Sequence, residues 1–483
     1  MKIREILLVL AIATAPVFAA QRNVVLFVAD DHGQDAGCYG NPTIKTPHID
    51  SLAAGGTRFV NAFATTASCS ASRSVILTGL YNHRTGQYGH EHDYHHFSSF
   101  DNLKSLPVLL NEAGYRTASV GKYHVAPKSV FAFDVFLPGS TRNPVEMAEN
   151  CRDFVTEDPD QPFFLYFCTS DPHRSGEVDE TSPHKPNRFG NRPGGYNGIQ
   201  EVKYSPEDVI VPPFLPDSAA ARAELAQYYQ SVSRLDQGLG RLISILDEAE
   251  ALEDTLVIYI SDHGIAFPGA KTTVYEPGLR SPCIVRHPYI QKRGVVNEAL
   301  VNWADLTPTI LDFAGIEPPD YEPHVQIELI RKELPDRHSL HGRSFLGILE
   351  ESNPDGWDTA YASHTFHEIQ MYYPMRVVRT RDFKLIWNIA HPLPFPFASD
   401  LWAAATWQDR WKMGENAQYG VRTVGEYINR PEFELYDMRK DPWESKNLAT
   451  DPEYKQVLAE LQQELQSFQR RTADPWLLKW DYE

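Results

Sequence analysis

The sequence is poor in cysteine, in positive charge and in long apolar runs, and each shortage excludes a class of protein. Five cysteines in 483 residues are too few, and odd in number, for a dense disulfide framework. Lysine and arginine total 45 against 64 aspartates and glutamates, so the net charge of −19 leaves no basic footprint for nucleic acid. No apolar run reaches the length of a membrane-spanning helix. We therefore expect neither a nucleic-acid partner nor a membrane span.

The sequence also lacks any Asn-x-Ser/Thr glycosylation site. The nearest match is Asn41-Pro42-Thr43, and its proline disqualifies it. Residues 1–20 have the pattern of a signal peptide, with Lys2 and Arg4, an apolar run and a small-residue cleavage site at Val17-Phe18-Ala19. An uncleaved N-terminal anchor is the alternative. These features favour an exported protein, either in a bacterial periplasm or secreted, over a lysosomal one.

The composition is that of a folded globular protein, with 42% hydrophobic and 12% aromatic residues. A chain of this length favours one large α/β domain and a smaller partner. Its acidic body would repel a polyanionic substrate, so any attraction must come from a local pocket of lysine, arginine and a metal. Cys168 and Cys283 lie in apolar runs typical of a core, and a pairing of Cys38 with Cys151 stays open.

Four apolar, β-rich runs each lead into a polar cluster. Because these runs do not alternate with polar residues, we expect strands buried on both faces of a mostly parallel sheet covered by helices. Helical patterns at residues 103–113 and 219–250 lie between them, which is typical of α/β proteins. The runs are Asn23–Ala29, Arg116–Val120, Phe163–Thr169 and Thr255–Ile260.

The character of the chain changes after about residue 355. Residues 375–387 predict a hairpin with a tight polar turn, and residues 433–437 another short strand. Apolar residues at helical spacing predict a packed helix over 452–470. Residues 317–345 and 389–430 are interpreted as long surface connections. We therefore expect a catalytic α/β domain over residues 21–358 and a smaller C-terminal domain with an antiparallel sheet and a helix over 359–483.

The four strand ends carry complementary chemistry, and in open α/β sheets sites form beyond such ends. Asp30, Asp31 and Asp262 form a carboxylate set suited to a hard divalent cation such as Ca²⁺ or Mg²⁺, which His263 could complete. Strand-end turns and helix caps are the alternative for any single aspartate. Further candidates are the cations Arg73, Lys122 and Lys271, which could neutralise a sulfate or phosphate, and the proton-transfer residues His124 and His173.

Cys69 stands where a polar loop gives way to an apolar run that can open a helix. A helix N-terminus suits an anion because its N–H groups are unpaired and its dipole end is positive. A buried structural cysteine is the alternative.

From about residue 22 to its end, the chain resembles the type I sulfatases. The resemblance rests on the pattern Cys69-x-Ala71-x-Arg73 followed by Leu77-Thr78-Gly79, together with motifs spread along the chain. These are Asp30-Asp31, Thr46–Asp50, Gly121–His124, Asp262–Gly264, Lys271 with Tyr275–Arg280, Asp305–Thr309, and Leu435–Asp437 with Asp441-Pro442. The family implies an alkaline-phosphatase-like large domain with a mixed, mostly parallel sheet.

The resemblance also implies roles for these residues. Cys69 would be oxidised to formylglycine, and the hydrated aldehyde would attack sulfur. The second hydroxyl of the hydrate could then expel sulfate and restore the aldehyde, a route that a plain serine or cysteine ester lacks. Arg73 and Lys122 would hold that hydrate with help from His124, while His173 and Lys271 face the sulfate and the leaving group. His173 would protonate the departing atom. The metal would be Ca²⁺, bound by Asp30, Asp31, Asp262 and His263.

Two positions depart from the commonest family pattern. Ala71 stands where many members have proline, which leaves open which maturation enzyme modifies Cys69. The fourth metal ligand is often asparagine, and here it is His263, a variant the family also uses.

Within the family, further segments resemble the sulfamidase group, which cleaves the S–N bond of N-sulfated glucosamine at the non-reducing end of heparin or heparan sulfate. These segments are Asp93–Phe100, Asp171–Arg174, His367-Glu368 with Tyr373–Arg376, Pro392–Phe397 and Asn447–Pro452. The candidate sugar contacts are His95, His96, His367, Glu368 and Arg376, with ordinary loop packing as their alternative.

Several other functions stay open from the sequence. They are a glycan O-sulfatase, a phosphoester or phosphonate hydrolase of the same superfamily, and a catalytically dead glycan-binding protein. The intact cysteine, cations and metal set argue against the last. Expected partners are a sulfated glycosaminoglycan oligosaccharide and a formylglycine-generating enzyme, and the family suggests a homodimer.

Overall fold

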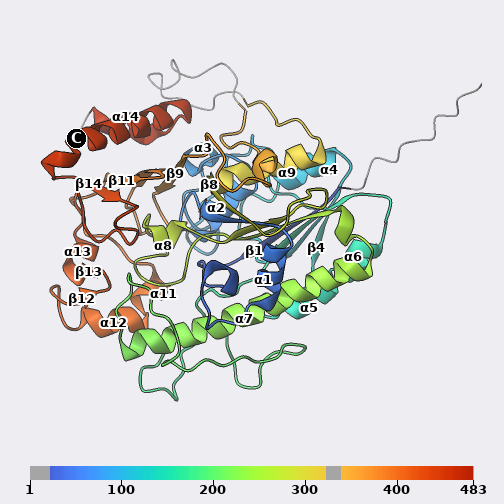
Figure 1. Ribbon diagram of the computed structural model, residues 1–483, viewed down its shortest axis with the longest axis horizontal. Coiled ribbons are helices and arrows are strands. Elements are labelled where there is room, and N and C mark those ends of the chain that lie inside the picture. The colour runs from blue at the N-terminus through green and yellow to red at the C-terminus, as the bar shows by residue number, and fades with distance from the viewer. Residues whose placement is uncertain (1–21, 322–338, 482–483) are drawn as a thin grey trace, which may run out of the picture.

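The computed structural model describes residues 22–321 and 339–481, which build a large and a smaller β-sheet and a two-stranded ribbon, with helices packed around them (Figure 1). The larger sheet has eight strands in the order β4-β3-β5-β1-β6-β7-β2-β8. Neighbouring strands are parallel except at β7, which runs antiparallel to both β6 and β2. The strands are β1 (Asn23–Ala29), β2 (Thr57–Phe63), β3 (Arg116–Gly121), β4 (Val135–Leu137), β5 (Phe163–Cys168), β6 (Thr255–Ser261), β7 (Cys283–Arg286) and β8 (Val295–Asn302).

Helices cover both faces of this sheet (Figure 1). One face carries α1 (Pro47–Ala54), α5 (Pro144–Asn150), α6 (Arg152–Thr156) and the long α7 (Ala219–Glu248). The other carries α2 (Cys69–Ile76), α3 (Asn82–Thr85), α4 (Leu106–Glu112) and α9 (Leu306–Ala314), while the short α8 (Glu276–Leu279) lies between β6 and β7 in the chain.

Strand β1 shows why its sequence is apolar without alternation. Val25 and Phe27 belong to the core that includes Leu235 of α7. Val24 and Leu26 belong to the core on the opposite face, which includes Ile76 of α2. Because successive side chains of a strand point to opposite faces, a strand covered on both sides must be apolar throughout.

The smaller sheet is antiparallel, in the order β14-β11-β10-β9. Helix α14 packs on it, and Phe468 stacks on Tyr361 with ring centroids 4.1 Å apart. The Ser363 amide donates to the Thr65 carbonyl at 2.8 Å, which ties this sheet to the loop before α2. The elements of this region are β9 (Thr359–His364), β10 (Met375–Thr380), β11 (Phe383–Asn388), α11 (Ser399–Trp402), α12 (Ala405–Trp411), β12 (Gln418–Tyr419), β13 (Arg422–Thr423), α13 (Val424–Ile428), β14 (Phe433–Asp437) and α14 (Lys455–Arg471).

The predicted α/β architecture is confirmed, including the four strands, both intervening helices, the hairpin and the C-terminal helix. The prediction of a surface connection over residues 389–430 is wrong. This segment contains three helices, and its aromatic residues Trp407, Tyr419 and Tyr427 are buried in a shared core. All five cysteines are free thiols, so Cys38 and Cys151 are not paired.

Some predictions fall on residues that the structure does not describe. These are the signal peptide at 1–20 and residues 322–338 of the proposed connection 317–345. Within the described part of the chain, no helix combines the length and apolar character needed to cross a membrane.

Candidate functional site

Cys69 is the first residue of α2, and all eight residues of this helix are buried. Its Sγ lies 3.4 Å from His263 Nε2 and 3.8 Å from Asp31 Oδ1. Burial raises the pKa of the Cys69 thiol well above its ordinary value, an effect that the nearby lysines do not overcome. The thiol is therefore protonated at neutral pH and is a poor nucleophile as it stands.

The candidate metal ligands meet because β1 and β6 are adjacent parallel strands, with Ala29 paired to Ser261. The Asp31 amide donates to Asp262 Oδ1 at 3.1 Å, and His263 Nε2 lies 3.0 Å from Asp31 Oδ1. All four candidate ligands are fully buried. The residue after His263 is Gly264, and no side chain fits there, because a Cβ atom would lie 1.9 Å from the Pro277 carbonyl oxygen.

Arg73 and Lys122 form ion pairs with two of these carboxylates, Asp30 and Asp262. Arg73 bridges Asp30 Oδ1 at 3.2 Å and Asp262 Oδ2 at 3.1 Å. Lys122 Nζ lies 2.7 Å from Asp30 Oδ2. Burial alone would raise the pKa of Asp30, but the positive charges of Lys122 and Arg73 hold it well below its ordinary value.

The charge balance of this network favours an additional cation. Two adjacent groups of ion pairs, Asp30 and Asp262 with Arg73 and Lys122, and Asp31 and Asp400 with Lys271, together contain four carboxylates and three cations. The pKa of Asp262 is raised by burial, and the neighbouring Asp30 and Asp31 add to the effect. Donor atoms of Asp31, Asp262, His263 and Cys69 all lie within 4.8 Å of one another, whereas Asp30 is outside this group and pairs with Arg73 and Lys122. The carboxylate oxygens of Asp31 and Asp262 suit a hard divalent cation, which would leave the network with a net positive charge that attracts an anion.

Lys271 links the carboxylates to the candidate proton-transfer residue. Its Nζ lies 2.9 Å from Asp31 Oδ2, 2.9 Å from His173 Nε2 and 3.0 Å from Asp400 Oδ2. His173 Nδ1 lies 2.5 Å from the Arg174 carbonyl oxygen, which can only accept, so this nitrogen carries the hydrogen. Burial and then Lys271 lower the pKa of His173 to about 4. His173 is therefore a neutral imidazole whose Nε2 accepts from Lys271.

A group of histidines forms the neighbouring wall. His124 Nε2 lies 2.6 Å from His92 Nδ1, and His90 Nε2 lies 2.9 Å from His367 Nε2. His367 Nδ1 in turn lies 2.9 Å from Ser68 Oγ, directly before α2. Burial, followed by the positive charge of Lys122, holds the pKa of His124 well below its ordinary value. These rings are therefore uncharged at neutral pH.

A cavity of about 650 Å³ opens above Cys69 and the carboxylates. Strand ends supply one side of its lining, and residues 90–95 and 367–400 supply another. Its lining residues are Asp30, His90, Glu91, His92, Asp93, Tyr94, His95, Lys122, His124, Arg142, Ser170, His173, Lys271, His367, Glu368, Ser399 and Asp400. Cys69, Arg73, Asp31, Asp262 and His263 are fully buried and are not lining residues. Arg73 contacts the lining residue Asp30 and Asp31 contacts Lys271, whereas Cys69 and His263 reach the lining through Asp31.

Two of the predicted sugar contacts are absent from this lining. His96 lies in the same loop as His95 but is exposed to solvent. Arg376 is fully buried, pairs with Asp474 through contacts of 2.5 and 2.9 Å, and lies over the Trp476 ring. The prediction of Arg376 as a sugar contact is wrong, because β10 places its guanidinium in a structural ion pair.

Other pocket residues were missed from the sequence. His90 and His92 carry a usable signal, since they stand in the same histidine-rich stretch as His95. The sequence around Asp400 carries no such signal, because this residue lies in the segment interpreted as a surface connection. Its carboxylate reaches Lys271 only through the packing of α11 and α12.

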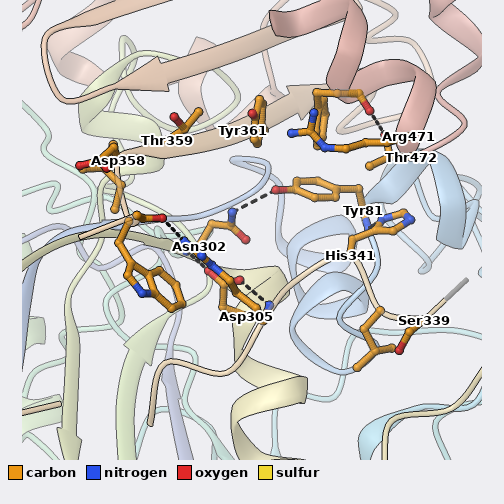
Figure 2. A pocket seen from close by; sticks show the side chains of 16 residues that line it. Tyr81, Asn302, Asp305, Ser339, His341, Asp358, Thr359, Tyr361, Arg471 and Thr472 are labelled. Carbon is orange, nitrogen blue, oxygen red and sulfur yellow. Dashed lines mark hydrogen bonds between the residues drawn. The ribbon is translucent and has the colours of Figure 1, made fainter. Parts of the chain in front are cut away.

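A second cavity, of about 500 Å³, lies between the end of α14, strand β9 and the chain that follows α2 (Figure 2). Its polar groups bond to one another. Asn302 Nδ2 donates to the Tyr81 hydroxyl at 3.0 Å, and Asp305 accepts from the backbone amides of Asn302 and Arg343. None of the predicted site residues lines it, and its lining comes both from the region of the large sheet and from the C-terminal region.

Two family models match the chain. The sulfatase model covers residues 22–316, and the model of the N-sulphoglucosamine sulphohydrolase C-terminal region covers residues 269–393.

Relatives match along nearly the whole chain. Human N-sulphoglucosamine sulphohydrolase is 41% identical over 95% of this chain and 92% of its own length. An N-acetylglucosamine-6-O-sulfatase of Bacteroides thetaiotaomicron is 26% identical over 94% of this chain and 87% of its own. A structure solved with its substrate D-glucosamine-2-N,6-O-disulfate shares the fold with a TM-score of 0.65, at 24% identity, over 94% of this chain and 99% of the other.

Proposed function

The chain belongs to the sulfatase family and is a hydrolase of sulfate ester or sulfamide bonds, and on that premise we propose that it removes the N-sulfate from glucosamine. The proposed substrate is the non-reducing end of a heparin or heparan sulfate oligosaccharide. The observation that carries this choice is the match to N-sulphoglucosamine sulphohydrolase over 95% of the chain, together with the C-terminal model, which includes the cavity residues His367 and Glu368.

We propose Ca²⁺ as the resident cation, held by Asp30, Asp31, Asp262 and His263. Such a cation would supply positive charge that neutralises and orients the oxygens of a sulfate group. The support is the surplus of one carboxylate in the buried network and the raised pKa of Asp262. The remaining charge on the sulfate would be met by Lys122 and Lys271, which both face the cavity.

We propose that Cys69 is converted to formylglycine by a maturation enzyme. A hydrated aldehyde at this position would supply the oxygen nucleophile that attacks sulfur. The buried, protonated thiol supports this, because it could not perform that chemistry itself. Arg73, which contacts Asp30 and Asp262, holds two of the surrounding carboxylates in place.

The leaving nitrogen needs a proton as the S–N bond breaks. Lys271 donates toward His173 Nε2, and His173 is neutral, so Lys271 is the charged donor of the pair. We therefore propose that Lys271 supplies the proton and that His173 shares it through their 2.9 Å contact. This modifies the role that the family resemblance implies for His173 as the direct donor.

The organisation of the protein in the cell is also proposed. Residues 1–20 would direct export to a periplasm or the medium, residues 21–358 would form the catalytic domain and residues 359–483 the smaller one. A homodimer is proposed from the family resemblance alone.

Sulfate release tests the main proposal. Protein produced with a maturation enzyme would be offered N-sulfoglucosamine, 6-O-sulfated N-acetylglucosamine and an aryl phosphate. We expect sulfate from the N-sulfated sugar. Release from the O-sulfated sugar alone would favour an O-sulfatase, the activity named for one of the 26% identical relatives, and phosphate release alone would place the protein outside both activities.

A further inference from the structure

Asp400 is a carboxylate that lines the cavity beside Lys271. Its Oδ2 accepts from Lys271 at 3.0 Å. Oxygen atoms of Asp31 and Asp400 and a ring nitrogen of His173 all lie within 4.8 Å of one another. Asp400 Oδ1 is buried and has no hydrogen-bond partner among the described residues. An ionised carboxylate oxygen without a donor is costly, so this atom is suited to receive one from a ligand.

The backbone holds Asp400 firmly in this position. The Ser399 amide and hydroxyl both donate to Glu368 Oε1, at 3.0 and 2.6 Å. On the other side of α11, Leu401 is buried against Met371 and Ala398. Helix α12 begins with amides that donate to the carboxylate of Glu224 on α7. The orientation of Asp400 is therefore set before a ligand arrives.

The chemistry of the two sulfate types differs at the atom next to sulfur. A sulfamate, R–NH–SO₃⁻, presents an N–H donor there, whereas a sulfate ester, R–O–SO₃⁻, presents only oxygen lone pairs. A carboxylate accepts but cannot donate, so it attracts the first and repels the second. Sites that pair with a substrate donor discriminate strongly against an analogue that lacks it.

We propose that Asp400 forms a subsite for the sulfamate nitrogen, where its free Oδ1 accepts the substrate N–H and later the ammonium group of the product. This inference rests on the proposed function and makes Asp400 the residue that selects N-sulfate over O-sulfate. During the reaction the attacking hydroxyl forms a bond to sulfur and releases its proton, while the S–N bond breaks and its electron pair stays on nitrogen. One proton from Lys271 completes the amine, and the proton of the attacking hydroxyl restores Lys271. The proton released when sulfate departs and the aldehyde forms again gives the ammonium. Asp400 gives up no proton at any stage.

A purely structural role is the competing explanation, because Asp400 also positions Lys271. Loss of that positioning would slow the hydrolysis of every sulfated substrate to the same extent. A subsite for nitrogen would instead change the ratio between an N-sulfated and an O-sulfated substrate of the same ring shape. N-sulfoglucosamine and glucose 2-O-sulfate form such a pair, because they differ at one atom.

The test compares wild type, Asp400→Asn and the matched control Asp409→Asn on these two sugars. Asp409 lies in the same region, is partly exposed and pairs with its neighbour Arg410. We expect Asp400→Asn to lower kcat/KM for N-sulfoglucosamine roughly 100-fold. We also expect the ratio of the two kcat/KM values to fall at least about tenfold, because an asparagine amide can donate to the ester oxygen. The control should match wild type.

The outcomes separate this inference from the function beneath it. A wild-type enzyme that releases no sulfate from N-sulfoglucosamine contradicts the proposed function and this inference with it. An active wild type combined with an equal loss on both sugars in Asp400→Asn contradicts the inference alone.

Inhibition of the wild-type enzyme gives a test that needs no folded variant. Glucosamine, with its ammonium group, should inhibit at least about tenfold more tightly than glucose, as a charged hydrogen bond predicts. Equal inhibition constants for the two sugars would overturn the inference. Inhibition by inorganic sulfate, measured in parallel, reports that the rest of the pocket is intact.

Discussion

The two walls of the cavity are built in different ways. The wall formed by strand ends places Asp30, Lys122 and Lys271 in a dense buried network in which each charge has an opposite partner. The wall formed by residues 90–95 and 367–400 consists of histidine and tyrosine rings and four carboxylates, with single hydrogen bonds such as that between His367 and Ser68. The first wall suits the charge of a sulfate, and the second suits the shape and polarity of a sugar.

This difference implies that the two walls control different kinetic quantities. Groups that face the reacting sulfur stabilise the transition state and act on kcat, whereas groups that hold the sugar act mainly on KM. Four experiments test whether one wall controls kcat and the other controls KM.

The largest effect is expected at the nucleophile position. Cys69→Ala should lower sulfate release by at least about 10⁴-fold, because removal of a nucleophile leaves only binding effects. Its melting temperature should stay within about 2 °C of wild type, since only one sulfur atom is lost. Cys283→Ala in β7 is the matched control, because Cys283 is equally buried and lies outside the site. It should change the melting temperature as little as Cys69→Ala does and keep turnover per folded molecule. Residual activity in Cys69→Ala above a hundredth of wild type would contradict the assignment.

Removal of the divalent cation should have the next largest effect. Chelation should lower kcat at least about 100-fold, because the carboxylate surplus would then repel an anionic substrate. Added Ca²⁺ should restore kcat in wild type but not in Asp262→Ala, which lacks one ligand. Isothermal titration calorimetry gives the accompanying binding measurement. Full activity after exhaustive chelation would contradict the proposal that a divalent cation acts at the strand-end wall.

A smaller effect is expected on the loop wall. Glu368→Ala removes the acceptor for both the Ser399 amide and its hydroxyl, which loosens the attachment of α11. We expect KM for N-sulfoglucosamine to rise about tenfold, as for two lost hydrogen bonds, with kcat changed less than about threefold. Steady-state kinetics measure both. A collapse of kcat with unchanged KM would place Glu368 functionally with the strand ends.

The smallest effect on activity is expected at Arg376, which lies outside both walls. Arg376→Met leaves Asp474 as a buried unpaired charge and should destabilise the fold by about 3–5 kcal/mol while KM stays unchanged. Urea unfolding and kinetics at low temperature measure the two quantities. An increase in KM without loss of stability would instead support Arg376 as a sugar contact.

The pH dependence of this pair has a definite sign. Burial would raise the pKa of Asp474, but Arg376 holds it well below its ordinary value. The stabilisation is therefore complete above about pH 4, the ordinary range of an unfolded aspartate, and is lost as the pH falls further. The stability difference between wild type and Asp474→Asn should shrink in the same direction.

The strand-end wall was predictable from the sequence because adjacency there follows from simple rules. Parallel strands bring their carboxyl ends to one edge, so Asp30 and Asp262 had to be neighbours once both runs were recognised as strands. The loop wall follows no such rule. His90 shares a stretch with His95, but Asp400 reaches Lys271 only through the packing of α11 and α12, which no local pattern encodes. The prediction of Arg376 as a sugar contact was wrong for the same reason, since its ion-pair partner Asp474 lies 98 residues away in the sequence.

The complete burial of α2 bears on when the proposed modification could happen. The Cys69 thiol has no exposed surface, and every other residue of its helix is buried as well. If Cys69 is converted to formylglycine as proposed, an enzyme could reach this side chain only before α2 is packed into the fold. Under that proposal the order of oxidation and folding would set the active fraction of a preparation, and enzyme supplied after folding would not raise it.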